Sequence, residues 1–310
     1  MKKFVSPILL FAAAVIWGFA FVAQKAASAM PPFALGASRS AIAVLALTPA
    51  VILFDRLSKN GRHLFTKARG ASAIGITKRE LTGGVICGVL LFGASTLQQT
   101  GISGTDAGKT AFITALYVLI VPILELIMRR KSPPRAWVGV GIAVIGFYLL
   151  CIKSDFTIES SDLLVALCAV MFAAQIIAVD AFLPTCDGVR LSLIQFASVA
   201  IISAVCSLVF EGASAFSSIV SCIPEILFLG ICSSGIAYTL QILGQNGTHP
   251  SVASIILSME SVFGALAAAI VLGERMSVKE YVGCGVVFLA VLVAQIDLSS
   301  LLKKVRARKS

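Results

Sequence analysis

The sequence has few charged residues, and this shortage excludes an ordinary soluble domain. Only 13% of the 310 residues are Asp, Glu, Lys or Arg, whereas 58% are hydrophobic and the mean hydropathy is +0.98. A typical soluble chain has about 25% charged residues. Apolar runs of about 18 residues or more recur along the whole length, and a helix of that length crosses a bilayer. The composition therefore predicts an all-α, polytopic integral membrane protein.

Motifs of metal sites, nucleotide-binding loops and hydrolases are also missing. The eight cysteines show no Cys-x-x-Cys spacing, and only two histidines are present, so we expect no metal site. The stretch 104–110 resembles a nucleotide-binding loop, but its two glycines are four residues apart instead of the required five. No His-Glu-x-x-His or Gly-x-Ser-x-Gly motif occurs. We therefore expect neither an enzyme nor a bound cofactor.

Ten apolar segments divide the chain, and the basic residues between them predict its orientation. The expected membrane spans are 7–28, 33–54, 81–100, 107–128, 136–152, 161–182, 189–210, 224–245, 251–272 and 279–296. Of the 25 Lys and Arg residues, 19 fall in the segments 2–3, 56–79, 129–135, 190 and 303–309. Basic loops remain in the cytoplasm, so both termini are expected there, in a cell (inner or plasma) membrane. The net charge of +10 follows from this topology and attraction to lipid headgroups, without nucleic-acid binding.

The chain contains an internal repeat. Gly-Ile-Ser-Gly-Thr at 101–105 aligns with Gly-Gln-Asn-Gly-Thr at 244–248, and after a one-residue slip 137–141 aligns with 281–285. Five spans in each copy require the second copy to be inserted upside down, which is typical of secondary transporters. We therefore expect two inverted five-helix repeats, at 1–153 and at 154–310, the second ending in a basic cytoplasmic tail.

Polar side chains recur on single faces of otherwise apolar spans. In the span 224–245, steps of four, three and four residues connect Ser234, Tyr238, Gln241 and Gln245, which places them on one helix face. Such a face lines a cavity or forms hydrogen bonds between helices, and Lys25 can instead extend to the headgroups. The candidates for the substrate cavity are Trp17, Phe21, Gln24, Lys25, Gln98, Gln99, Thr114, Tyr117, Gln175, Tyr238, Gln241 and Gln245.

Two carboxyl groups lie inside predicted spans. Glu125 is in the span 107–128, and Glu260 is in the span 251–272, where the repeat aligns it with Tyr117. An ionisable group in the membrane usually faces a partner or a wet cavity, and burial disfavours its charged form. Glu125 and Glu260 are therefore candidates for coupling transport to a proton, and neutralisation by a neighbouring group is the alternative.

Three segments resemble the drug/metabolite transporter superfamily, specifically its EamA-type ten-helix members. These are Trp-Gly-Phe-Ala-Phe-Val at 17–22 followed by Lys25, Ser-Gly-Ile-Ala-Tyr at 234–238, and Ser-Met-Glu-Ser-Val at 258–262 followed by Leu-Gly-Glu at 272–274. The chain departs from the family pattern at Ser261, where a proline is common. The resemblance implies a carrier of small metabolites, amino acids or drug-like compounds, frequently an exporter.

The expected function is therefore secondary-active transport by alternating access. The partners are a small-molecule substrate, the lipid bilayer and a coupling ion such as the proton. The alternative is a membrane channel or a non-transporting membrane scaffold. A channel usually gains its pore from symmetric subunits or a ring of charges, and neither is readable from the residues.

Overall fold

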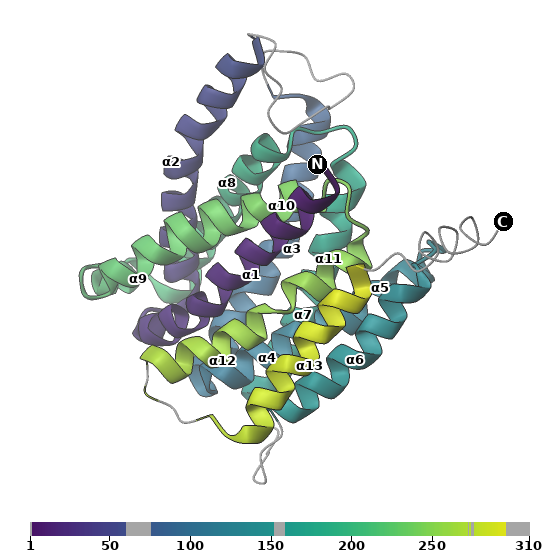
Figure 1. Cartoon of the computed structure of the whole chain (residues 1–310). Coiled ribbons are helices and arrows are strands. Elements are labelled where there is room, and N and C mark those ends of the chain that lie inside the picture. The colour runs from purple at the N-terminus through teal and green to yellow at the C-terminus, as the bar shows by residue number, and fades with distance from the viewer. Residues whose placement is uncertain (1, 60–75, 152–158, 272, 274–275, 296–310) are drawn as a thin grey trace, which may run out of the picture.

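The computed structural model describes residues 2–59, 76–151, 159–271, 273 and 276–295. Within these ranges every regular element is a helix (Figure 1). Nine helical segments are long and apolar enough to cross a membrane, and the shorter apolar helix Pro134–Leu150 brings the number of apolar segments to ten. Because hydrocarbon offers no hydrogen-bond partners, such segments must satisfy their backbone internally as helices. The expectation of an all-α membrane protein with ten helices is confirmed.

Five apolar segments form the first repeat and five form the second. The elements of the first repeat are α1 (Lys2–Ala26), η1 (Ala27–Ala29), α2 (Pro32–Lys59), α3 (Lys78–Gly104), α4 (Ala107–Ala115), α5 (Tyr117–Ile127) and α6 (Pro134–Cys151). Those of the second repeat are α7 (Ser160–Phe182), α8 (Gly188–Cys206), η2 (Ser207–Glu211), η3 (Ala213–Cys222), α9 (Ile223–Leu227), η4 (Phe228–Ala237), α10 (Tyr238–Gln245), α11 (Pro250–Leu257), α12 (Glu260–Val271) and α13 (Val278–Gln295). The predicted boundary at 153/154 lies outside the described residues.

The two repeats pack against each other in a reciprocal manner. The first helix of the first repeat, α1, packs on η4, α10 and α12 of the second, while the first helix of the second repeat, α7, packs on α3, α4 and α5 of the first. The last helices, α6 and α13, lie side by side, and α2 packs on α8 (Figure 1). This exchange of equivalent contacts is the packing expected of two related halves in a common bundle.

Local sequence signals fix several helix ends. The side chain of Thr77 caps α3, where it accepts a hydrogen bond from the backbone N–H of Glu80 at 3.1 Å, and Asp187 caps α8 through the N–H groups of Val189 and Arg190. Capping satisfies N–H groups that have no partner within the helix. These two caps meet at one end of the bundle, so they also determine how α3 and α8 begin side by side.

Two membrane segments are interrupted at equivalent positions of the repeat. The segment Ala107–Ile127 breaks between α4 and α5 at Leu116, and the segment Pro250–Val271 breaks between α11 and α12 after Leu257. At both breaks the chain makes a tighter turn, with the N–H of Leu116 bonded to the carbonyl of Ile113 and that of Met259 to the carbonyl of Ile256. Tyr117 and Glu260 therefore begin the second halves of matching broken helices.

Candidate functional site

A small cavity lies between the repeats at the level of the two helix breaks. Its lining comes from both repeats, and Tyr117 and Glu260 in it lie near the midpoints of the spans Ala107–Ile127 and Pro250–Val271. About 30 Å³ is open to the centres of water-sized molecules, enough for about two waters. The lining residues are Trp17, Ala20, Phe21, Gln24, Arg39, Gln98, Thr114, Tyr117, Phe172, Gln175, Ile176, Ser233, Tyr238, Gln241, Leu257 and Glu260.

The structure brings most of the predicted cavity residues together. Of the twelve, the cavity lining includes Trp17, Phe21, Gln24, Gln98, Thr114, Tyr117, Gln175, Tyr238 and Gln241, and it also includes the proton candidate Glu260. Lys25, Gln99, Gln245 and the second proton candidate, Glu125, lie outside it. Residues from α1, α3, α4, α5, α7 and α10, remote in sequence, thus face one space.

The residues placed outside the cavity make local contacts instead. Lys25 donates through Nζ to the carbonyls of Ile102 and Thr105 at 3.0 and 2.8 Å, at the end of α3. Gln99 donates to the carbonyl of Gln24 at 3.2 Å, and Gln245 donates to that of Ile176 at 2.9 Å. These contacts are the interhelical bonding that polar side chains provide within membranes. Lys25 therefore binds the end of a neighbouring helix, where a cation is favoured.

A π-helix changes which serine of the polar stripe faces the cavity. The segment η4 (Phe228–Ala237) is a π-helix, so side chains five residues apart lie on one side of it. Consequently Ser233, five residues before Tyr238, lines the cavity, and Ser234, which the regular helical spacing predicts, does not. Trp17 donates its indole N–H to the carbonyl of Ser233 at 3.3 Å. The regular spacing that groups Ser234 with Tyr238 and Gln241 assumes an uninterrupted α-helix, which this segment is not.

The cavity lining contains aromatic rings and amides. The rings of Trp17 and Tyr238 lie 4.6 Å apart between centroids, a distance typical of favourable ring contacts. Gln241 donates to Gln175 at 3.0 Å, and Gln175 donates to Gln195 at 2.9 Å, so a chain of amides crosses from α10 to α7 and α8. Such a lining offers both apolar surface and hydrogen-bonding groups.

Two ionisable groups complete the lining, Arg39 from α2 and Glu260 from α12. Arg39 is 5% exposed and Glu260 is 4% exposed. Both interact electrostatically with the phenol of Tyr238, and Glu260 also interacts with Tyr117. Among the described residues neither Arg39 nor Glu260 belongs to an ion pair. The cavity thus holds a buried cation and a buried carboxyl group that do not neutralise each other by direct contact.

Sequence reasoning missed Arg39 as a site residue. It was counted among basic residues within helices, although a single arginine in the apolar span 33–54 is itself a signal, since charged groups at membrane depth usually serve a function. Gly230 of η4 brings α2 close, because a Cβ atom there would lie 2.9 Å from the carbonyl oxygen of Arg39 and 2.6 Å from Ile42. The missing side chain at Gly230 therefore places Arg39 against the π-helix.

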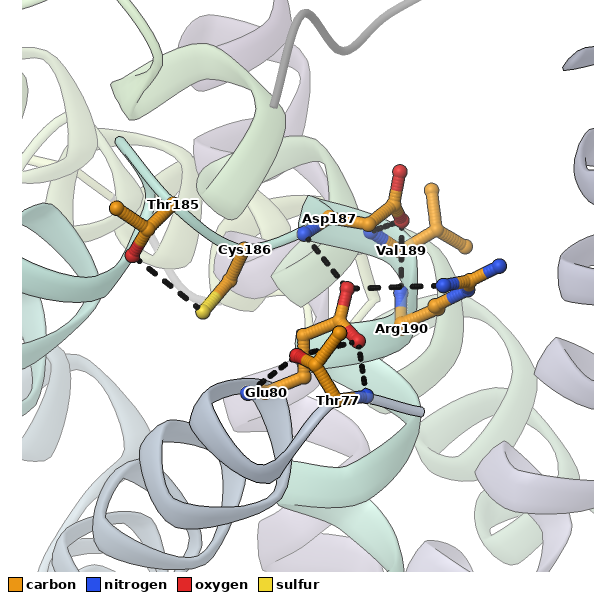
Figure 2. Close-up of polar contacts among 7 residues, drawn as sticks. All are labelled: Thr77, Glu80, Thr185, Cys186, Asp187, Val189 and Arg190. Carbon is orange, nitrogen blue, oxygen red and sulfur yellow. Dashed lines mark hydrogen bonds and ion pairs between the residues drawn. The ribbon is translucent and has the colours of Figure 1, made fainter. Parts of the chain in front are cut away.

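Polar contacts join the two repeats at the end of the bundle where α3 and α8 begin. Glu80, fully buried, accepts hydrogen bonds from the N–H groups of Thr77 at 2.8 Å and Asp187 at 3.1 Å, and pairs with Arg190 at 3.8 Å (Figure 2). Two segments remote in sequence, the starts of α3 and α8, thus meet at one carboxylate. The contact fixes the first repeat to the second on this face.

Glu125 belongs to a second cluster at the same end. Its carboxylate accepts hydrogen bonds from Ser132 at 2.6 Å and from Ser251, and it lies 3.4 Å from Nδ1 of His249. Nearby, Arg130 pairs with Asp180 at 2.9 Å. Glu125 comes from the first repeat, whereas His249, Ser251 and Asp180 come from the second. This cluster therefore forms a further connection between the repeats.

The opposite end of the bundle is closed by different contacts. Lys109 at the start of α4 pairs with Asp162 at the start of α7 at 2.6 Å. Glu211 accepts hydrogen bonds from the N–H groups of Phe33 and Ala34 at 2.9 and 2.8 Å and so caps α2. The Lys25 contacts lie at the same end. Polar contacts thus join the two repeats at both ends of the bundle.

The described residues contain no group of three or more His, Cys, Asp and Glu side chains placed to hold a metal ion. Cys87, Cys168, Cys186 and Cys222 are buried free thiols, and Cys206, Cys232 and Cys284 are partly exposed free thiols. The cavity lining itself offers aromatic rings, amide groups, one guanidinium and one carboxyl group.

Comparison with known proteins agrees with this architecture. A model of the EamA-like transporter family matches residues 5–152 and, separately, residues 159–295. The chain is 29% identical over 298 residues to an uncharacterized transporter of Archaeoglobus fulgidus, a match that covers 96% of this chain and 87% of that protein. A protein of known crystal structure is 18% identical to this chain, and the two structures superimpose with a TM-score of 0.71 over 93% of this chain and 96% of the other. The two proteins therefore share a fold. The chain belongs to the EamA-like transporter family and is a multi-pass membrane transporter.

Proposed function

We propose that this transporter is a secondary-active carrier that moves a small solute by alternating access. The observation that supports the proposal is the cavity between the repeats, which lies at two matching helix breaks. Broken helices at the repeat interface near the bilayer midplane are typical of carriers with inverted repeats. In this mechanism an outward-open and an inward-open form load and release the solute.

The moving parts in this proposal are the two repeats, 1–153 and 154–310. In one half of the cycle, the contacts of Glu80 and Glu125 break and the cavity opens at their end. In the other half, the Lys109–Asp162 pair breaks and the cavity opens at the opposite end. Charged contacts that exchange between two arrangements are a common switching element. The solute remains near Tyr238 and Gln241 while access alternates around it.

The orientation in the membrane follows the basic loops. We place both termini in the cytoplasm of a cell (inner or plasma) membrane, so the end of the bundle with Glu80 and Glu125 faces inward. Export of small metabolites, amino acids or drug-like compounds is the direction that the family resemblance favours. Flux measured in vesicles of each orientation tests this direction, because an exporter loads inside-out vesicles.

Glu260 is the stronger of the two candidates for proton coupling. It lines the cavity, and its Oε1 atom is buried without a hydrogen bond to any described residue. Glu125, in contrast, is held by two serine hydroxyls and His249 outside the cavity. A coupling group must exchange its proton with the same space that the solute enters. We therefore assign proton exchange to Glu260 and structural closure to Glu125.

Counterflow in proteoliposomes tests the carrier mechanism. Vesicles loaded with unlabelled solute should accumulate labelled solute transiently, because a carrier exchanges one molecule for another while a channel does not. Gln241→Ala and Tyr238→Phe should each reduce saturable flux, and Ser254→Ala, a buried position outside the cavity lining, should leave it unchanged. Flux that is not saturable, or equal flux in all variants, contradicts the proposal.

A further inference from the structure

Arg39 is a buried cation whose surroundings differ from those of the other buried arginine. Arg190 is similarly covered, at 6% exposed, but it pairs with Glu80. Arg39 is 5% exposed, lines the cavity, and has no ion pair or hydrogen bond to the described residues. A charge at membrane depth is costly unless it is paired or hydrated. The partner of Arg39 must therefore come from within the cavity.

The chemistry of the guanidinium group specifies that partner. Arginine presents its N–H donors in a planar fork that matches two oxygens of a carboxylate, and it stays charged at every physiological pH. The nearest described carboxyl group in the lining, that of Glu260, lies beyond the 4.0 Å limit of an ion pair with it. The phenol of Tyr238 interacts electrostatically with both Arg39 and Glu260. The space beside Arg39 is therefore suited to an anion.

We propose that Arg39 binds the carboxylate of the transported solute, so that the substrate is a small organic acid with its remaining body against Trp17 and Tyr238. This assignment rests on the proposed transport function and narrows it, since cationic and neutral drug-like compounds lack the group that Arg39 selects. Glu260 belongs to the same lining. There it balances charge, either by contact with a cationic group of the solute or by taking up one proton with each monoanion.

Ligand-induced thermal stabilisation of the detergent-purified full chain tests the assignment. The probes are carboxylates paired with their own amides, such as phenylacetate with phenylacetamide, isobutyrate with isobutyramide, and phenylalanine with phenylalaninamide. A ligand that binds the folded state raises its stability. We expect at least one carboxylate to raise the melting temperature and its matched amide to have little effect. The proposal is overturned if the amides stabilise the protein as much as the carboxylates do. It is also overturned if none of the carboxylates raises the melting temperature at millimolar concentration.

Substitution of Arg39 provides the second arm of the test. Arg39→Gln should weaken binding of the stabilising carboxylate at least tenfold, and Arg39→Lys should retain part of it, because the charge remains but the fork is lost. Arg79→Gln, at an exposed position in the first turn of α3, is the matched control and should bind normally. Without ligand, Arg39→Gln should melt at the same or a higher temperature than the parent, because an unpaired buried charge is removed. A lower melting temperature with unchanged carboxylate binding indicates a structural role and refutes the assignment.

Flux measurements separate this proposal from the proposed function. If carboxylate binding depends on Arg39 but the protein shows no saturable flux, the assignment of Arg39 is supported and the transport function is refuted. If an amide shows saturable flux and Arg39→Gln does not change that flux, the transport function is supported and the assignment of Arg39 is refuted. The two failures therefore give different results in the same set of variants.

Discussion

The buried carboxylate of Glu80 provides the most quantitative prediction about how the repeats are held together. Its oxygens accept hydrogen bonds from the N–H and hydroxyl groups of Thr77 at 2.8 and 3.0 Å and from the N–H of Asp187 at 3.1 Å (Figure 2). It also pairs with Arg190, which is 6% exposed. Glu80→Ala removes one partner of a buried ion pair together with the glutamate half of the capping box of α3, while Thr77 can still accept from the backbone N–H of residue 80.

The expected loss follows from these contacts. Breaking a buried ion pair by removal of one partner costs about 3–5 kcal/mol, and loss of a helix cap alone costs about 1 kcal/mol. Because contacts at one carboxylate are not additive, we expect a total loss of about 3–5 kcal/mol, which lowers the folded-to-unfolded ratio at least about 100-fold. Glu80→Gln, which keeps an acceptor but loses the charge, should lie between the parent and Glu80→Ala.

Glu280 is the matched control for this prediction. It forms the same kind of capping box at the start of α13, with the N–H of Ser277 at 2.6 Å, but it is only partly buried. Glu280→Ala should therefore cost only about 0.5–2 kcal/mol. Unfolding of the three variants by SDS titration in mixed micelles measures the differences. A loss for Glu80→Ala within about 0.5 kcal/mol of that for Glu280→Ala refutes the reasoning.

Three further predictions address packing, the helix end and thiol reactivity. Gly18→Ala should lower stability by about 1–3 kcal/mol, since its Cβ would lie 2.3 Å from that of Phe263, whereas Gly285→Ala, with no atom within 4 Å, should be tolerated in the same melting assay. Lys25→Met should lower the melting temperature, because it loses carbonyl partners at the end of α3; an unchanged value would mean that Lys25 only reaches toward headgroups. Burial raises the pKa of the Cys186 thiol, a shift that the contact with Thr185 partly opposes. Its thiolate therefore forms at higher pH than usual, and maleimide labelling at Cys186 near neutral pH should be slower than at a free cysteine peptide, with equal rates contradicting the assignment.

Much of the fold was predictable from the sequence because membrane helices are specified by simple physical requirements. Apolar length defines the spans, and the duplicated glycines at 101–104 and 244–247 indicate the repeat. The breaks at Leu116 and after Leu257 were not predicted. Neither contains the usual signals: Pro122 lies six residues beyond the first break, and the second follows a run of good apolar residues. They depend on packing between the repeats, which periodicity within one helix does not report.

The cavity was predicted in part for a related reason. Trp17, Phe21 and Gln24 are candidates separated by four and three residues in one predicted span, and all three belong to the cavity lining. Spacing failed at Ser234, because one π-helix shifts the register. It also failed to separate Gln241, in the cavity, from Gln245, which bonds to a backbone carbonyl. Which end of a polar stripe meets the cavity depends on the neighbouring helices.

Arg39 shows the limit of counting charges by loop. The orientation of the chain is predicted from the basic residues between the spans. Arg39 lies within the span 33–54 and therefore does not contribute to that prediction. The structure places it in the same cavity as Glu260. An intramembrane charge is better treated as a site candidate from the outset, with its partner sought among other intramembrane groups.

Access to the cavity from the two sides of the membrane tests the central claim most directly. In a variant whose eight native cysteines are replaced by alanine, Ser233→Cys places one thiol in the cavity lining, and Ser254→Cys, buried outside the lining, is the control. A membrane-impermeant thiol reagent is applied to vesicles of each orientation. Alternating access predicts labelling of Cys at 233 from both sides, with a stabilising carboxylate slowing both, and no labelling at 254. Labelling at 233 from one side only, under every condition, would contradict the account.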